Sequence, residues 1–163
     1  MLPLTDAQLR SSFVNASRRE AAAAPLPRGF PELSWDDLDF LGWVDPRLSR
    51  RAYAVIPTDR GPVGFVLTTE AVGRPKPTVC VWCEDVKDTD DVVLYVARRA
   101  GSAGRDGNSL GTMLHSDLSC SAHVRRPPTP QEAGPDPAAF IADRITGLQL
   151  RTTAFAERLR DGT

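Results

Sequence analysis

Apolar residues form short runs separated by polar turn sequences in the middle of the chain, where the pattern predicts β-strands. In RAYAVIP (51–57), Tyr53 and Val55 alternate with Ala54 and Ile56. GPVGFVLT (61–68) follows after the turn sequence TDRGP, and the two runs together predict a β-hairpin. TVCVWC (78–83) is short and β-branched, and VVLYVARR (92–99) is a further run typical of a strand. We therefore expect a β-rich centre.

Helical signals lie towards both ends of the chain. TDAQ and SRRE each place a capping hydroxyl three positions before Gln8 or Glu20. The first predicts a short helix over about 6–14, and the second predicts either its extension or a second helix. Closely spaced aromatic residues in SWDDLDFLGW (34–43) predict one or two helical turns that bury them. From Asp136 onward, apolar residues near helical spacing predict a long terminal helix.

Glycine and proline divide the rest of the chain. GSAGRDGN (101–108) predicts a long turn, and a helix is expected after Cys120 until Pro127 ends it. The fold class is therefore α+β, with an antiparallel β-sheet. We expect one domain made of an N-terminal helical segment packed on the core (1–49), a β-rich core (50–126), a Pro-rich linker (127–136) and a C-terminal helix (137–163).

Composition narrows the class of protein. The chain has 163 residues and a net charge of −1, so bulk charge does not favour wholesale nucleic-acid binding, although a local basic patch is compatible with it. The sequence contains no run of about eighteen apolar residues and no basic-then-apolar leader, so we expect a cytoplasmic protein without a membrane partner. Three cysteines cannot all pair as disulfides, and a reducing cytosol favours thiolates.

Two close pairs of potential ligands predict a metal site. Cys80 and Cys83 form a C-x-x-C, and His115 and Cys120 follow thirty-one residues later with four residues between them. Zinc prefers tetrahedral Cys and His ligation in structural sites, and a filled shell of three cysteines and one histidine leaves no open position for water. We expect one Zn²⁺ per chain that stabilises the fold and catalyses no reaction.

Other interpretations of these residues remain open. A lone C-x-x-C can be a redox dithiol, although here an acidic loop follows it instead of a helix N-terminus that would lower a thiol pKa. His123 stands three residues after Cys120 and is an alternative to His115 as ligand. His115 and Cys120 can also be unrelated to the metal. A catalytic zinc is less favoured because no general acid–base partner accompanies the motif.

The motifs together resemble a known family. LSWDDLDFLGWVDP, RAYAVIPT, GPVGFVL, CVWC and ARRAGSAGRDGNSLGTMLHSDLSCSAHVR look like the FBP domain. That domain is the C-terminal treble-clef zinc finger of elongation factor G-binding proteins of the fusidic-acid resistance type. The resemblance covers about residues 5–126. The family typically has cysteine where this chain has His115, and histidine preserves tetrahedral zinc ligation.

The resemblance implies a non-catalytic protein that binds elongation factor G and helps it leave the ribosome. No phosphate-binding loop and no Ser-His-Asp set is apparent, so we expect no small-molecule substrate. The half of the chain around the finger is locally positive, and arginine suits interfaces because its guanidinium bonds carboxylates in pairs. The candidate contact residues are Arg98, Arg99, Arg105, Arg125 and Arg126. The alternative partner is ribosomal RNA, whose binding would weaken steeply with salt.

Overall fold

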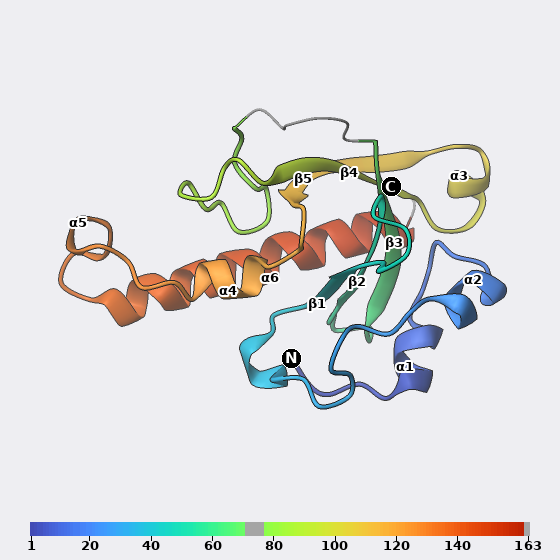
Figure 1. Cartoon of the computed structure of the whole chain (residues 1–163), viewed down its shortest axis with the longest axis horizontal. Helices are drawn as coiled ribbons and strands as arrows, with labels where there is room; N and C mark the ends of the chain where they lie inside the picture. The colour runs from blue at the N-terminus through green and yellow to red at the C-terminus, as the bar shows by residue number, and fades with distance from the viewer. Residues whose placement is uncertain (71–76, 162–163) are drawn as a thin grey trace.

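The computed structural model describes residues 1–70 and 77–161. It is a mixed α and β fold built on one antiparallel sheet of five strands in the order β1-β2-β3-β4-β5 (Figure 1). Residues 71–76 of the predicted core and 162–163 of the predicted terminal helix lie outside the described residues. The strands are β1 (Leu41–Val44), β2 (Arg51–Ile56), β3 (Val63–Thr69), β4 (Val92–Arg98) and β5 (Ser109–His115).

Seven helical elements surround the sheet within the described residues. Both N-terminal capping boxes are confirmed, with the Thr5 and Ser17 side chains accepting the backbone N–H of Gln8 and Glu20 respectively. The helices are α1 (Asp6–Ser11), α2 (Arg18–Ala23), the 3₁₀ turn η1 (Trp35–Asp37), α3 (Gly101–Arg105), α4 (Cys120–Val124), α5 (Pro130–Ala133) and α6 (Pro137–Asp161).

The sheet is buried on both faces along β2. The alanines of β2 and its terminal Ile56 join a core that includes Leu148 and Phe155 of α6, whereas Tyr53 and Val55 join a second core with Leu9 of α1. Each fully buried large apolar side chain stabilises the fold by about 1.5–3 kcal/mol. Because both faces are covered there, β2 is apolar from Ala52 to Ile56 instead of alternating with polar residues.

The first helix is shorter than predicted because the chain after it joins the sheet. Among the described residues, β3 and β4 pair directly at Thr68 with Val96 and at Thr69 with Tyr95. In the gap, the Asn15 amide accepts from the Val66 N–H at 2.8 Å and donates to the carbonyls of Val66 and Arg98, each at 3.0 Å. A polar side chain therefore replaces part of the β3–β4 ladder.

Two further local predictions are corrected. Residues 34–43 form only one 3₁₀ turn and then β1, because the backbone of Leu41 to Val44 pairs with β2 and its aromatic residue Trp43 stacks on Tyr53 at 5.1 Å. The glycine-rich stretch expected as a turn contains the short helix α3. After this helix the chain turns back towards β5, and the Asn108 N–H donates to the Ala103 carbonyl. The hairpin β2–β3, strand β4 and the helix after Cys120 are confirmed.

Candidate metal centre

The turn that carries the first two cysteines is anchored by the tryptophan between them. Trp82 is fully buried and meets Phe40 edge to face at 5.0 Å and Phe155 of α6 at 5.6 Å. Arg151 of α6 donates to the Trp82 carbonyl at 2.7 Å. The neighbouring valines Val79 and Val81 are exposed, and the turn over residues 81–83, closed by the Glu84 N–H donating to the Cys80 carbonyl at 2.9 Å, buries both thiols. Packing of the tryptophan thus fixes the C-x-x-C turn.

The third cysteine is the first residue of α4. A tight turn joins β5 to this helix, with the Leu118 N–H donating to the His115 carbonyl at 3.1 Å and Leu118 at a φ of 61°. The Leu118 side chain is buried in the main core, which explains how a bulky residue is held in a left-handed conformation. This turn brings Cys120 back over the C-x-x-C.

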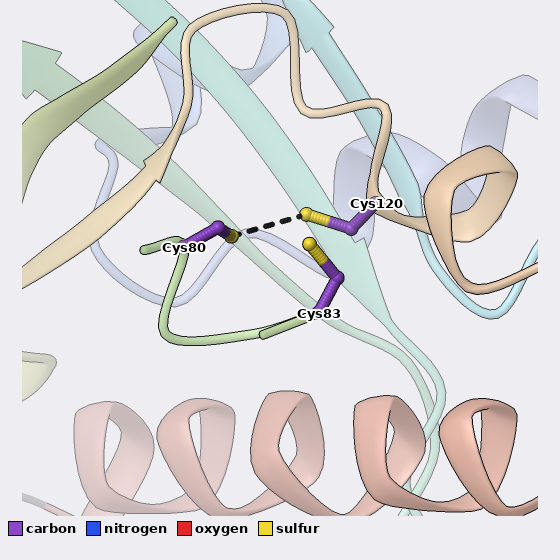
Figure 2. Close-up of side chains that lie close together, drawn as sticks. All are labelled: Cys80, Cys83 and Cys120. Carbon is purple, nitrogen blue, oxygen red and sulfur yellow. Dashed lines mark hydrogen bonds between the residues drawn. The ribbon is translucent and has the colours of Figure 1, made fainter. Parts of the chain in front are cut away.

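The three thiols converge in the interior (Figure 2). Cys80 and Cys120 Sγ lie 3.6 Å apart, and all three sulfurs lie within 4.8 Å of one another. Hydrogen bonds from the Cys120 and Cys83 thiols lower the pKa of Cys80, whereas donating to Cys80 raises the pKa of Cys120. All three side chains are buried. Redox-sensing thiols are usually accessible to solvent, so burial favours a metal site over a redox dithiol.

A pair of imidazoles lies beside the sulfurs. His115, the last residue of β5, is 1% exposed, and its Nε2 lies 2.8 Å from Nδ1 of His123. One ring nitrogen of each histidine and the Cys83 sulfur fall within 4.8 Å of one another, whereas the cluster of three sulfurs does not include His115. Cys83 therefore belongs to both groups.

The ring nitrogens of the two histidines differ in their partners. Within the described residues, His115 Nδ1 is one of two buried side-chain polar atoms without a hydrogen-bond partner. Both nitrogens of His123 are engaged, Nδ1 with His115 and Nε2 with Ser119 Oγ at 3.2 Å. An unpartnered buried nitrogen costs about 1–3 kcal/mol, and a metal ion would satisfy it. The donor set of three thiols and this nitrogen fits a zinc ion.

Acidic side chains close to His123 are neutralised by arginine. Asp85 and Asp88 place oxygens within 4.8 Å of a His123 nitrogen, a grouping that can also hold cations. Arg126 occupies this position, with contacts of 3.2 Å to Asp85 and 2.5 Å to Asp88. The hydrogen bond to Asp88 raises the pKa of Arg126. The arginine thus ties α4 to the acidic loop after the C-x-x-C.

The five arginines predicted as a contact face do not come together. Arg125 forms a two-pronged ion pair with Asp39, whose side chain is 1% exposed, and Arg126 is held by the acidic loop. Arg98, Arg99 and Arg105 instead line one hollow beside α2. Two of the five are thus engaged in ion pairs within the fold, and the contact role of the other three stays a prediction.

Sequence reasoning missed the partners of Arg125 and His115. Asp39 lies 86 residues from Arg125, and it also accepts from Gln149 of α6 at 2.9 Å. No local pattern links residues so far apart. The contact between His115 and His123 depends on the left-handed turn at Leu118, which a helix prediction after Cys120 does not specify.

A C-x-x-C turn, a β-hairpin after it and a helix that begins at the last cysteine are the three parts of a treble clef. The fold and the buried thiols thus define a zinc-finger protein of the treble-clef class. The family model for the FBP C-terminal treble-clef zinc-finger matches residues 8–159, nearly the whole chain, and the chain belongs to this family. The match extends beyond the resemblance seen in the sequence, because it includes α6.

The other comparisons bring no relative. No curated protein and no solved structure matches the chain. Over the described residues, none of the helices combines the length and the apolar character needed to cross a bilayer. The family match and the cluster of three cysteines together support zinc binding.

Proposed function

We propose that this chain is a zinc-stabilised, non-catalytic protein that binds translation elongation factor G and promotes its release from the ribosome. The observation that carries the proposal is the match to the FBP treble-clef family over residues 8–159. The buried cluster of three cysteines supports the zinc part of it, because zinc binds cysteine as thiolate and balances the charge of thiolates that are buried away from water.

The proposed zinc ligands are Cys80, Cys83, Cys120 and His115. His115 is preferred to His123 because its Nδ1 is buried and has no hydrogen-bond partner, whereas both His123 nitrogens are engaged. Four protein ligands leave no coordination position for water or substrate, so the ion would stabilise the fold and would not act as a Lewis acid. Structural zinc of this kind contributes folding free energy on the order of 10 kcal/mol.

The fourth ligand can be tested by substitution. His115→Ala should lower zinc content per chain and the unfolding temperature together, because it removes a ligand and leaves a cavity. His115→Cys should retain one zinc per chain, since a thiolate is an equally good zinc ligand. Elemental analysis after metal-replete expression measures both. A His115→Ala protein that keeps one zinc per chain and the wild-type unfolding temperature would exclude His115 from the site.

The partner can be tested with purified components. Elongation factor G from the same organism, treated with nuclease, should form a complex with this chain in calorimetry without nucleotide hydrolysis. A nuclease-treated sample separates a protein complex from one bridged by RNA. An unrelated GTPase of similar size is the control. No heat and no shift in size exclusion at tens of micromolar would contradict the proposed partner.

A further inference from the structure

Side chains from three neighbouring strands and α2 surround one hollow beside the sheet, and two of them are arginines. This hollow has a volume of about 200 Å³ and is lined by Arg51 of β2, Thr68 of β3 and Arg98 of β4, with Glu20 of α2. Arg51 pairs with Thr68 in register, and Thr68 pairs with Val96, two residues before Arg98. The two arginines therefore lie on the same face of the sheet.

Three further hollows join the first, and together we call them the arginine groove. On one side, a hollow of about 360 Å³ shares Glu20 and Arg98 and adds Arg99 and Arg105. On the other side, hollows of about 610 and 400 Å³ both share Arg51. They add Arg19, Arg47 and Arg50. The groove is therefore a continuous row of arginines along the molecule.

The few acids in the groove are already engaged. Glu20 accepts from the Ser17 backbone N–H at 2.9 Å as part of the α2 cap. Asp45 is buried and accepts from the Tyr53 hydroxyl at 2.8 Å. Glu70 pairs with Arg50 at 3.5 Å, and both are well exposed. These acids are fewer than the arginines around them, so the groove carries excess positive charge.

Three of the arginines are exposed and form no ion pair with the described residues. Arg47, Arg98 and Arg105 are exposed, and none of them forms an ion pair with the part of the chain that the structure describes. Arg98 and Arg51 both lower the pKa of Glu20, after the larger effect of its hydrogen bonds from Ser17. The positive charge is therefore open to solvent and to a ligand.

Charge is segregated between the two ends of the molecule. Asp90, Asp91 and Asp117 line a hollow beside His115 and His123, at the metal centre, together with Lys87 and with Asp88, which pairs with Arg126. Figure 1 places α2 and α3, which border the arginine groove, at one end and α4 and α5 at the other. The net charge of −1 is therefore the sum over a positive end and a negative end. Such a chain would approach a polyanion with the arginine groove first.

We propose that the arginine groove binds the phosphate backbone of RNA without reading its base sequence. A row of guanidinium groups fits a linear polyanion, whose phosphates recur at regular intervals, and arginine bonds phosphate oxygens in pairs. The one aromatic side chain that lines the groove, Tyr53, is buried, so the groove offers no exposed ring for base stacking. The groove also offers little apolar surface of the kind that anchors a protein partner. Leu48 is its main exposed apolar side chain.

This inference goes beyond the binding of elongation factor G, and it assigns Arg98, Arg99 and Arg105, three of the predicted elongation-factor contacts, to RNA. It adds a surface that contacts RNA, at the opposite end of the molecule from the metal centre. The proposed RNA binding and the proposed binding of elongation factor G can therefore be tested separately. On a ribosome, both a protein partner and exposed RNA backbone are available to one molecule.

The test is fluorescence anisotropy with a labelled single-stranded RNA of mixed sequence, and with poly-glutamate as an acidic polypeptide. Wild-type protein should bind RNA with micromolar affinity at 50 mM salt, on the order expected for a non-specific complex. Arg47→Glu with Arg98→Glu should weaken binding about tenfold or more. The slope of log affinity against log salt should also become shallower by about 1.4, or roughly 0.7 for each phosphate that the variant no longer neutralises.

The matched control is Arg28→Glu with Arg60→Glu, which makes the same charge change at exposed sites outside the groove. It should alter RNA affinity less than twofold. If the groove variant unfolds, Arg47→Gln with Arg98→Gln repeats the test without charge reversal. Equal effects of control and groove variants, or binding of poly-glutamate with none of RNA, would overturn the proposal. So would loss of elongation factor G binding by a groove variant that keeps wild-type RNA affinity.

Discussion

Nε2 of His115 and Nδ1 of His123 lie 2.8 Å apart, which fixes how the proton on each ring can be placed. If Nδ1 of His115 binds the metal, its Nε2 carries a proton and donates to His123. The remaining proton of His123 is then on Nε2, 3.2 Å from Ser119 Oγ. A residue that hydrogen-bonds to the second ring nitrogen of a metal-binding histidine holds that histidine in one tautomer and orientation. His123 is thus a positioning residue for the metal centre.

His123→Ala should lower zinc affinity about 10- to 100-fold while leaving one zinc per chain at saturating metal. The reason is that His115 loses the partner that holds its ring. Competition with a coloured chelator measures the affinity. Asp90→Ala, an exposed acid lining the same hollow, should change it less than twofold. If zinc content at saturation also falls by half or more, His123 is itself a ligand.

Arg125→Ala should destabilise the protein by about 3 kcal/mol, because it leaves the buried Asp39 carboxylate without its cationic partner. Chemical denaturation with zinc present measures the free energy of unfolding. Arg105→Ala is the control, since Arg105 is exposed and forms no ion pair with the described residues, and it should stay within about 0.5 kcal/mol of wild type. Equal stabilities of the two variants would show that the ion pair is not needed by the fold.

Asn15→Ala should cost about 2 kcal/mol. It removes the amide that satisfies the Val66 N–H and the carbonyls of Val66 and Arg98 between β3 and β4. Asn108→Ala, at an exposed position after α3, should have little effect. Hydrogen exchange at Val66 reports the same change directly, and unchanged protection there would rule out the bridging role.

Asp45 should make stability depend on pH in the acid range. Burial opposes its ionisation, but hydrogen bonds from the Arg47 backbone and the Tyr53 hydroxyl outweigh burial and lower the pKa of Asp45. A carboxyl whose folded pKa is lowered adds stability above its unfolded pKa, near 4, and loses it as pH falls through the folded pKa.

The comparison for this prediction is Asp45→Asn against wild type at pH 7 and pH 3. The gap between their free energies of unfolding should narrow at the lower pH. Both proteins contain the same metal centre, so zinc loss in acid affects them alike. A gap of constant size would mean that the carboxylate charge at Asp45 contributes nothing.

The sequence contained enough information for the strands and caps but not for the long-range polar contacts. The hairpin β2–β3 followed from its apolar runs, and the two capping boxes followed from residues three positions apart. β1 was missed because its four residues lie among aspartates and aromatics that resemble a helical turn. β5 alternates buried and exposed positions over its first four residues, but its sequence SLGTMLH does not alternate apolar with polar residues, so the sequence did not reveal it.

The residues of the metal centre were likewise predictable from the sequence only in part. The spacing of Cys80, Cys83 and Cys120 was enough to predict their convergence, because a C-x-x-C turn and a helix start can face one another. The role of Arg125 could not be predicted, since its partner lies on a distant loop before β1. Ion pairs of this kind depend on how separate elements pack, which no local pattern records.

Native mass spectrometry of the purified chain, alone and mixed with nuclease-treated elongation factor G, tests the central claim most directly. It reads metal content and complex formation in one measurement. The account predicts a chain carrying one zinc ion and a one-to-one complex with the factor that survives without nucleotide or RNA. A folded chain without metal, together with no complex at tens of micromolar factor, would contradict it.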